Sequence, residues 1–126
     1  MSKVNGKRIL VVEDEALLAL DLRFALEDLG ASVVGPCYRL ATALSTAELG
    51  GIDAAVLDVD LAGETVFPVA DLLRKADVPF VFHTGRLNPQ TLAEIYQDAP
   101  VCPKPTDPET VARTLFALLE KRQATH

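Results

Sequence analysis

Five short apolar segments alternate with amphipathic segments along the chain, and this alternation constrains the fold more than any other feature of the sequence. Repeated strand-then-helix units place parallel strands in a central sheet and helices on its faces. The expected strands are residues 8–12, 32–35, 54–57, 80–83 and 101–102. The pattern therefore predicts one α/β domain built on a five-stranded parallel sheet.

The helices between these strands are marked by apolar spacing and by turn residues. Apolar residues recur at helical spacing before Gly30, so we expect the first helix to bury Leu18, Leu22, Ala25 and Leu29. Asn88 and Asp107 each precede a proline, which is typical of an N-cap followed by the first helical position. These signals predict the starts of the last two helices.

The composition excludes several classes of function. Among 126 residues, 18 acidic side chains outnumber 12 basic ones and give a formal net charge of −6. Nucleic-acid phosphates and anionic lipids repel such a chain, so we expect neither nucleic acid nor membrane as a partner. The sequence has no secretory signal and no run of about eighteen apolar residues, which favours a cytoplasmic protein.

Cysteine and histidine show no metal-binding pattern. Cys37 and Cys102 are too few for a disulfide framework and have no zinc-ligand spacing, so we expect reduced, buried thiols. His83 lies among apolar residues, which favours a strand histidine with satisfied hydrogen bonds over a metal ligand.

Acidic side chains follow two of the expected strands. Glu13, Asp14 and Glu15 follow the first strand, and Asp58 and Asp60 follow the third. Functional residues of open parallel sheets gather at the carboxyl ends of the strands, so these carboxylates are expected at one edge. Clustered like charges need a cation, and Mg²⁺ takes one or two protein carboxylates together with phosphate. Asp14 and Asp58 fit that count, with Asp58 as the nucleophile that would form an aspartyl phosphate.

Two further strands end in residues that complete the same chemistry. Thr84 closes the fourth strand and offers a hydroxyl donor to a phosphoryl oxygen. Lys104 follows the fifth strand and offers a cation, while Pro105 fixes the turn, with a cis bond as one option. An isolated acid after a strand usually caps a helix and sits in a solvated loop, and we interpret Glu15 in that way. Because residues at four strand ends suit the same chemistry, we interpret the remaining acids as part of a phosphoryl site.

These residues resemble the response regulator receiver family of two-component phosphorelays over residues 7–122. The resemblance rests on the segments ILVVEDE, AAVLDVDLAGE, VFHTG and CPKP, which occur in the family's order and context. It implies a flavodoxin-like (βα)5 three-layer sandwich with a five-stranded parallel sheet in the order 2-1-3-4-5. We find no linker or repeat, so we expect a receiver domain without an output domain.

The resemblance also assigns roles and partners. It implies that Asp58 accepts a phosphoryl group from the phosphohistidine of a sensor histidine kinase, with Thr84 and Lys104 contacting the phosphoryl oxygens. Phosphorylation would signal to a downstream target protein, or the phosphoryl group would pass to a histidine phosphotransfer protein. Such a domain catalyses its own phosphorylation and dephosphorylation, so we interpret the chain as a signalling phosphoacceptor and not as an enzyme.

A metal site is implied in the same way. By resemblance, Asp14, Asp58 and the backbone carbonyl of Asp60 would hold Mg²⁺, and Glu13 would act mainly through water.

The sequence departs from the family at Val101, where many receivers carry a Tyr or Phe that swings inward when the threonine moves. Without that ring, activation would move the backbone around Gly85 and the short helix that follows. Residues 82–85 read Phe-His-Thr-Gly and partly resemble a receiver subgroup marked by Phe-Ala-Thr-Gly, which also lacks the aromatic residue. Membership in that subgroup would imply a kinase from the variant histidine-kinase groups.

Two other functions fit parts of the pattern. Asp58 and Asp60 match the two-aspartate motif of small Mg²⁺-dependent haloacid-dehalogenase-like phosphohydrolases. Against this, Ala62 stands where that motif usually has Thr or Val, the nucleophile would end the third strand instead of the first, and no cap domain is evident. A docking module that is never phosphorylated is the other alternative, and the complete set of acids, threonine and lysine argues against it.

Asp60 and Arg86 lie two residues beyond the phosphoacceptor and the threonine, where the family tunes the phosphoryl lifetime. We hypothesise that this oppositely charged pair partly blocks attacking water. Arg86→Ala is expected to change the rate at which phosphorylated protein loses its label, and an unchanged rate would contradict the hypothesis.

Overall fold

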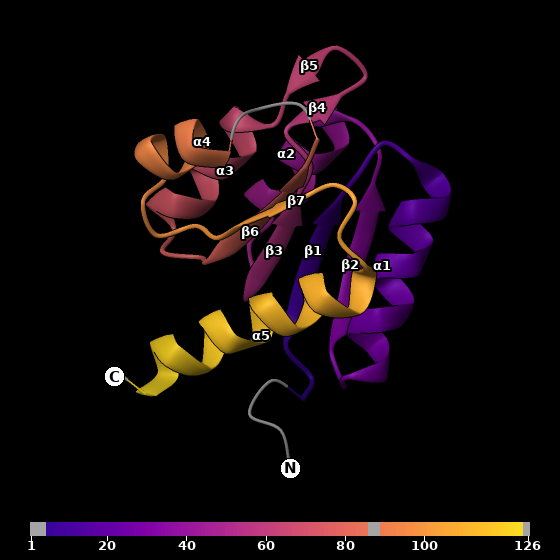
Figure 1. The fold of residues 1–126 in the computed structure, drawn as a ribbon, viewed down its shortest axis with the longest axis vertical. Helices are drawn as coiled ribbons and strands as arrows, with labels where there is room; N and C mark the ends of the chain where they lie inside the picture. Colours follow the sequence, from indigo (N-terminus) through magenta and orange to yellow (C-terminus); the bar gives the residue numbers. More distant parts are fainter. Residues whose placement is uncertain (1–4, 86–88, 125–126) are drawn as a thin grey trace.

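The computed structural model describes residues 5–85 and 89–124 and shows strands and helices in alternation (Figure 1). The elements in chain order are β1 (Arg8–Val12), α1 (Ala16–Asp28), β2 (Ser32–Cys37), α2 (Leu40–Glu48), β3 (Ala54–Leu57), β4 (Asp60–Leu61), β5 (Glu64–Thr65), α3 (Phe67–Lys75), β6 (Phe80–Thr84), α4 (Pro89–Ile95), β7 (Val101–Pro103) and α5 (Pro108–Ala124). None of the helices in the described ranges is long and apolar enough to cross a bilayer.

A parallel sheet occupies the centre of the molecule. Its strand order is β2-β1-β3-β6-β7, which confirms the predicted order 2-1-3-4-5 because β4 and β5 form a separate small sheet. Helices α1 and α5 lie against one face, and α2, α3 and α4 lie against the other, which gives three layers (Figure 1). The strand order reverses between β1 and β3, and a crevice forms at the carboxyl ends of strands at such a point.

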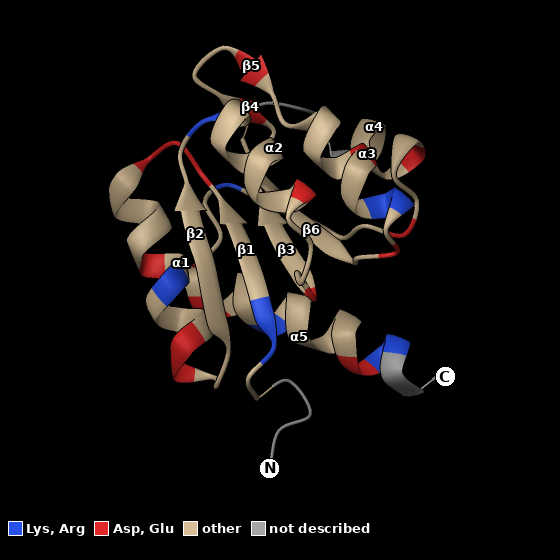
Figure 2. Cartoon of the chain, turned by 180° about the vertical axis from the view of Figure 1, so that it is seen from behind, with Lys and Arg blue, Asp and Glu red and all other residues tan. Residues whose placement is uncertain are grey.

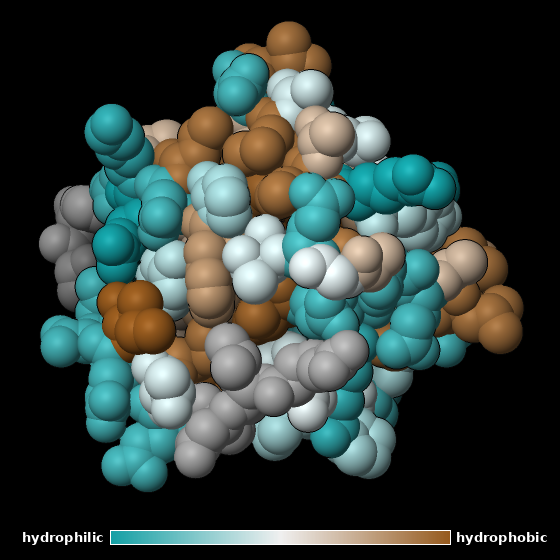
Figure 3. Space-filling model, turned by 90° about the horizontal axis from the view of Figure 1, so that it is seen from above, coloured by the Kyte–Doolittle hydropathy of each residue, from teal (hydrophilic) through white to brown (hydrophobic). Residues whose placement is uncertain are grey.

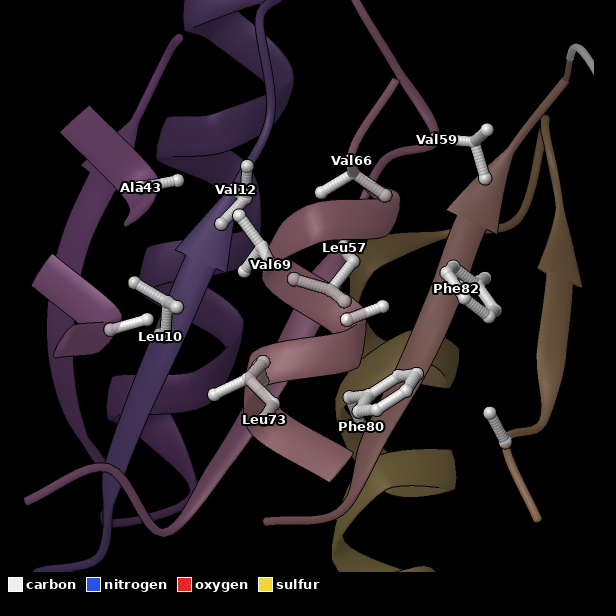
Figure 4. Close-up of a cluster of buried hydrophobic side chains, with 14 of the residues drawn as sticks. Leu10, Val12, Ala43, Leu57, Val59, Val66, Val69, Leu73, Phe80 and Phe82 are labelled. Atoms are coloured by element: carbon white, nitrogen blue, oxygen red, sulfur yellow. The ribbon is translucent and has the colours of Figure 1, made fainter. Parts of the chain in front are cut away.

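The sheet separates two hydrophobic clusters. Successive side chains of a strand point to opposite faces, so each buried strand supplies both clusters. On the α2–α3–α4 face, Leu10 and Val12 of β1, Leu57 of β3 and Phe82 of β6 pack with Val69 of α3 (Figure 4). This double-sided burial explains why the central strands consist of continuous apolar runs.

Helix α1 differs from the prediction in the stripe that it buries. Its buried residues are Ala19, Leu22 and Leu26, whereas Leu18, Ala25 and Leu29 are half-buried. Apolar residues cover a wide arc of this helix, so the spacing in the sequence fits two neighbouring stripes. Packing against the sheet and α5 selects one of them, which overrides the sequence pattern.

Other local expectations have mixed outcomes. Asp107 caps α5 as predicted, because the backbone N–H of Thr110 donates to its Oδ2 at 3.0 Å. Asn88, the other expected cap, lies outside the described residues. Cys37 and Cys102 are buried free thiols, as predicted. The segment after Asp58, for which the sequence predicts no strand, forms the β4–β5 hairpin.

Two leucines of α1 offer a matched test of the packing. Leu22 is fully buried and Leu17 is 80% exposed. Leu22→Ala is expected to lower the free energy of unfolding by about 2–5 kcal/mol, because it leaves a cavity beneath the helix. Leu17→Ala should change it by less than about 0.5 kcal/mol. Urea denaturation followed by circular dichroism measures both, and equal losses would contradict this orientation of α1.

Candidate phosphoryl and cation site

The predicted acids meet at the carboxyl edge of the sheet. Glu13 and Asp14 follow β1, and Asp58 follows β3, which pairs with β1 in parallel. One carboxylate oxygen of each of these three residues lies within 4.8 Å of the others. We call Glu13, Asp14 and Asp58 the acidic cluster. Figure 2 shows the acidic run between β1 and α1 at the end of the sheet that carries β4.

Lys104 joins this cluster from the end of β7. Its Nζ lies 3.1 Å from Asp58 Oδ2 and 3.2 Å from Glu13 Oε1. The backbone N–H of Lys104 donates to the carbonyl of Thr84 at 2.9 Å, which joins the ends of β6 and β7. The Lys104–Pro105 bond is cis, the option that the sequence left open. Lys104 therefore lies between the two most buried acids of the cluster.

Burial sets the electrostatics of the cluster. Glu13 is 1% exposed and Asp58 is 4% exposed. Burial and the charge of Asp58 raise the pKa of Glu13 from 4.5 to about 8. Burial alone would lower the pKa of Lys104, but its hydrogen bond to Asp58 and the charge of Glu13 raise it instead. The single positive charge of Lys104 is therefore outnumbered by the carboxyl groups around it, and the site is largely shielded from water.

The site has unused capacity for a further cation. Glu13 Oε2 is buried and has no hydrogen-bond partner within residues 5–85 and 89–124. When Glu13 is ionised, this buried oxygen without a partner carries a desolvation cost that a cation would offset. Oxygen ligands from carboxylates are those that Mg²⁺ takes in proteins. The residues that the structure brings together therefore fit the predicted Mg²⁺ site.

Asp60 contacts the acidic cluster through its backbone, because its N–H donates to Asp58 Oδ1 at 3.4 Å. Its Oδ1 accepts a hydrogen bond from the backbone N–H of Gly63 at 3.1 Å. The sequence placed Asp60 in the metal site through its backbone carbonyl, and that role stays a prediction. Arg86, its proposed partner, lies outside the described residues.

Thr84 ends β6 at the same edge of the sheet and is 2% exposed. The hydrogen bond from the backbone N–H of Lys104 to its carbonyl places Thr84 next to Lys104. Its role toward a phosphoryl oxygen stays a prediction.

Sequence reasoning missed the role of Glu15. This residue is the N-cap of α1 by position, but its side chain makes no capping hydrogen bond. Its Oε1 lies 3.5 Å from Lys104 Nζ instead. Glu15 is exposed at the N-cap position, as expected, but the expected capping hydrogen bond is absent and its carboxylate pairs with the lysine that follows β7, 89 residues along the chain. The run of three acids after β1 was the available signal.

His83 is a buried strand residue, as expected. The side chain is 1% exposed, and the groups that act on its ring include the backbone of Thr106 and the ammonium of Lys104. Burial lowers the pKa of His83 below 6.5, and the Lys104 ammonium lowers it further. The sequence could not show this, because it depends on which groups face the ring.

An aromatic ring does lie near Val101, although the sequence offers none at that position. Tyr96 is buried, and its ring centroid lies 5.3 Å from that of Phe82, which pairs with Val101 across the sheet. The Tyr96 hydroxyl donates to Asp71 Oδ1 at 2.8 Å. Burial and this hydrogen bond raise the pKa of Tyr96 to about 12. Tyr96 thus connects β6 to α3 from the end of α4.

These features define a class: a three-layer α/β domain with buried acids and a lysine at the carboxyl edge of its sheet. Figure 3 looks down on the molecule from above and shows hydrophilic residues interleaved with hydrophobic ones. In open α/β sheets, ligands bind outside the carboxyl ends of the strands, and the acids and the lysine of this chain lie at that edge.

Comparison with known proteins identifies the family. The chain is 43% identical to SdrG from Sphingomonas melonis Fr1, whose solution structure matches with a TM-score of 0.76 over 91% of this chain and 97% of that one. A response regulator receiver protein from Sinorhizobium medicae is 25% identical, with a TM-score of 0.78 over 93% and 97% of the two chains. No protein-family model matches the sequence. The chain belongs to the response regulator receiver family.

A curated relative agrees with this assignment. The phyllosphere-induced regulator PhyR of Methylorubrum extorquens is 30% identical over 119 residues, which are 92% of this chain. The chain spans 45% of the length of that protein.

Glu13→Gln tests how far the buried charge of Glu13 lowers the free energy of unfolding. In protein free of divalent cations, the native pKa of about 8 lies above the unfolded value of 4.5. The native state therefore binds more protons than the unfolded chain between these pH values, and stability falls as pH rises through that window. Because Gln cannot ionise, the substitution should raise the free energy of unfolding by roughly 2 kcal/mol at about pH 7 and change it little at about pH 4.

Urea denaturation in the presence of a chelator measures this effect. Glu48→Gln, at an exposed position of α2, is the matched control and should show no such gain. A Glu13→Gln protein that is less stable than wild type at neutral pH would contradict the prediction.

Proposed function

We propose that this receiver domain carries a phosphoryl group on Asp58, with Mg²⁺ as its cofactor. The observation that carries the proposal is the position of Lys104 Nζ, 3.1 Å from Asp58 Oδ2, beside an acidic cluster in which Glu13 Oε2 is buried without a partner. A cation fixed beside a nucleophile stabilises the negative charge that a transferred phosphoryl group brings. Membership in the receiver family supports the same function.

Asp58 acts as the nucleophile in the proposed reaction. An oxygen of its carboxylate forms a bond to the phosphorus while the bond between phosphorus and the donor histidine nitrogen breaks, and the electron pair of that bond stays on the nitrogen. Lys104 already contacts Asp58 and can pair with the incoming phosphoryl oxygens. Thr84 offers its hydroxyl as a further donor at the same edge.

Glu13, Asp14 and Asp58 are the residues that would hold the metal ion. Bound Mg²⁺ supplies charge neutralisation, which lets an anionic phosphoryl group approach an anionic carboxylate. The backbone carbonyl of Asp60 is the further ligand that the family resemblance implies.

The proposed donor is the phosphohistidine of a sensor histidine kinase. The proposed output is a conformational change that a target protein recognises, or transfer of the phosphoryl group to a histidine phosphotransfer protein. The family is one of signalling proteins, so the proposed chemistry serves to mark a state and not to turn over a substrate.

Labelling with a small phosphodonor tests the proposal. Wild-type protein with radiolabelled acetyl phosphate and Mg²⁺ should gain a single base-labile phosphoryl group, and chelation of Mg²⁺ should prevent this. Asp58→Ala should abolish labelling, because it removes the nucleophile. Asp98→Ala, which removes an exposed acid far along the chain from the cluster, is the matched control and should label normally.

Two outcomes would contradict the proposal. Equal labelling of Asp58→Ala and wild type would place the phosphoryl group elsewhere. Steady hydrolysis of sugar phosphates by the wild-type protein would favour the phosphohydrolase alternative. If acetyl phosphate labels Asp58, a survey of phosphotransfer from the histidine kinases of the source organism then identifies the donor.

A further inference from the structure

We infer that the β4–β5 hairpin is a positioning element for Asp14. The backbone N–H of Ala62 donates to Asp14 Oδ2 at 3.1 Å, although the two residues are 48 apart in the sequence. A carboxylate that accepts a hydrogen bond from a backbone amide is held in one direction. The inference rests on the proposed function, since it names what orients one carboxylate of the proposed cation site.

Asp14 depends on such a donor because its neighbours repel it. Carboxylate oxygens of Glu13 and Asp58 lie within 4.8 Å of one of its own. The ammonium of Lys104 pairs with Glu13, with Asp58 and with a third acid outside the cluster. Asp14 is half-buried, so repulsion would turn an untethered side chain toward water, where charges are screened. The Ala62 amide opposes that rotation.

The turn of the hairpin presents this amide in a fixed direction. The strands β4 and β5 pair in antiparallel register and leave Ala62 and Gly63 as a two-residue turn, with φ of 53° and 93°. Two positive φ values are typical of the type I′ turn, whose twist matches that of the flanking strands. Alanine adopts positive φ at an energetic cost, so surrounding contacts must hold it there.

Three contacts supply that restraint. The side chain of Leu61 is buried in the hydrophobic cluster on the α2–α3–α4 face. The backbone N–H of Val66 donates to the carbonyl of Val59 at 2.9 Å and closes the base of the hairpin. Gly63 N–H donates to Asp60 Oδ1 at 3.1 Å within the turn. The hairpin is thus anchored to the core through Leu61 and hydrogen-bonded to Asp14 through Ala62. Figure 1 shows β4 and β5 beyond the carboxyl ends of the central strands.

Hydrogen exchange of the Ala62 amide tests the contact without any metal. In protein free of divalent cations, Asp14→Ala should speed this exchange about tenfold relative to wild type, because the amide loses its acceptor. Asp14→Asn keeps an acceptor oxygen and should retain most of the protection. Nuclear magnetic resonance measures the exchange at this single amide, with the amide of Leu10 in β1 as an internal reference for the fold.

A pair of substitutions at position 62 tests the consequence. Ala62→Pro removes the N–H and cannot adopt positive φ, so the dissociation constant for Mg²⁺ should rise about tenfold. Ala62→Gly keeps the N–H and tolerates this φ, so its Mg²⁺ affinity should match wild type. Calorimetric titration with Mg²⁺ measures the affinities, and circular dichroism confirms that each variant is folded.

Wild-type Mg²⁺ affinity in a folded Ala62→Pro protein would overturn the inference, and so would equal exchange of the Ala62 amide in wild type and Asp14→Ala. If Ala62→Pro does not fold, the exchange comparison decides by itself. If the wild-type protein takes neither Mg²⁺ nor a phosphoryl group, the proposed function fails, and the exchange comparison still decides whether the hairpin holds Asp14.

Discussion

The ammonium of Lys104 lies between the carboxylates of Glu13 and Asp58, and the rest of the site depends on this contact. Three strand ends must meet for it to form, since Glu13 follows β1, Asp58 follows β3 and Lys104 follows β7. The acids are buried and would repel each other without a cation, which is why the pKa of Glu13 is raised even with the lysine in place. The charge is therefore only partly neutralised, which suits the metal ion that we propose for this site.

Two neighbouring segments, the β4–β5 hairpin and β6, hold other residues of the site in place around this contact. On one side, the β4–β5 hairpin places the Ala62 amide on Asp14. On the other side, β6 carries Thr84 at the site and Phe82 two residues earlier, where its ring packs against Tyr96. Tyr96 in turn contacts α3 through its hydroxyl. A ring from the end of α4 thus occupies the neighbourhood in which many family members use an aromatic residue at the position of Val101.

Much of the site could be predicted because the chemistry lies at strand ends. The apolar runs locate the strands, and a residue directly after a parallel strand must lie at the carboxyl edge of the sheet. Asp14, Asp58, Thr84 and Lys104 therefore come together for reasons visible in the sequence. The ion pair of Glu15 was missed because a cap and an ion pair need the same residue type at the same position. The hairpin was missed because β4 and β5 have two residues each, which is too short for a periodic pattern.

The sequence by itself determined the order of strands and helices, the edge at which the acids gather and the kind of chemistry that they can perform. Tertiary structure decided the rest: the stripe that α1 buries, the pairing of Glu15 with Lys104, the hairpin amide on Asp14 and the approach of Tyr96 to Phe82. The physical reason is that periodicity reports which face of a segment is apolar, whereas hydrogen bonds and ion pairs depend on distances between residues far apart in the chain.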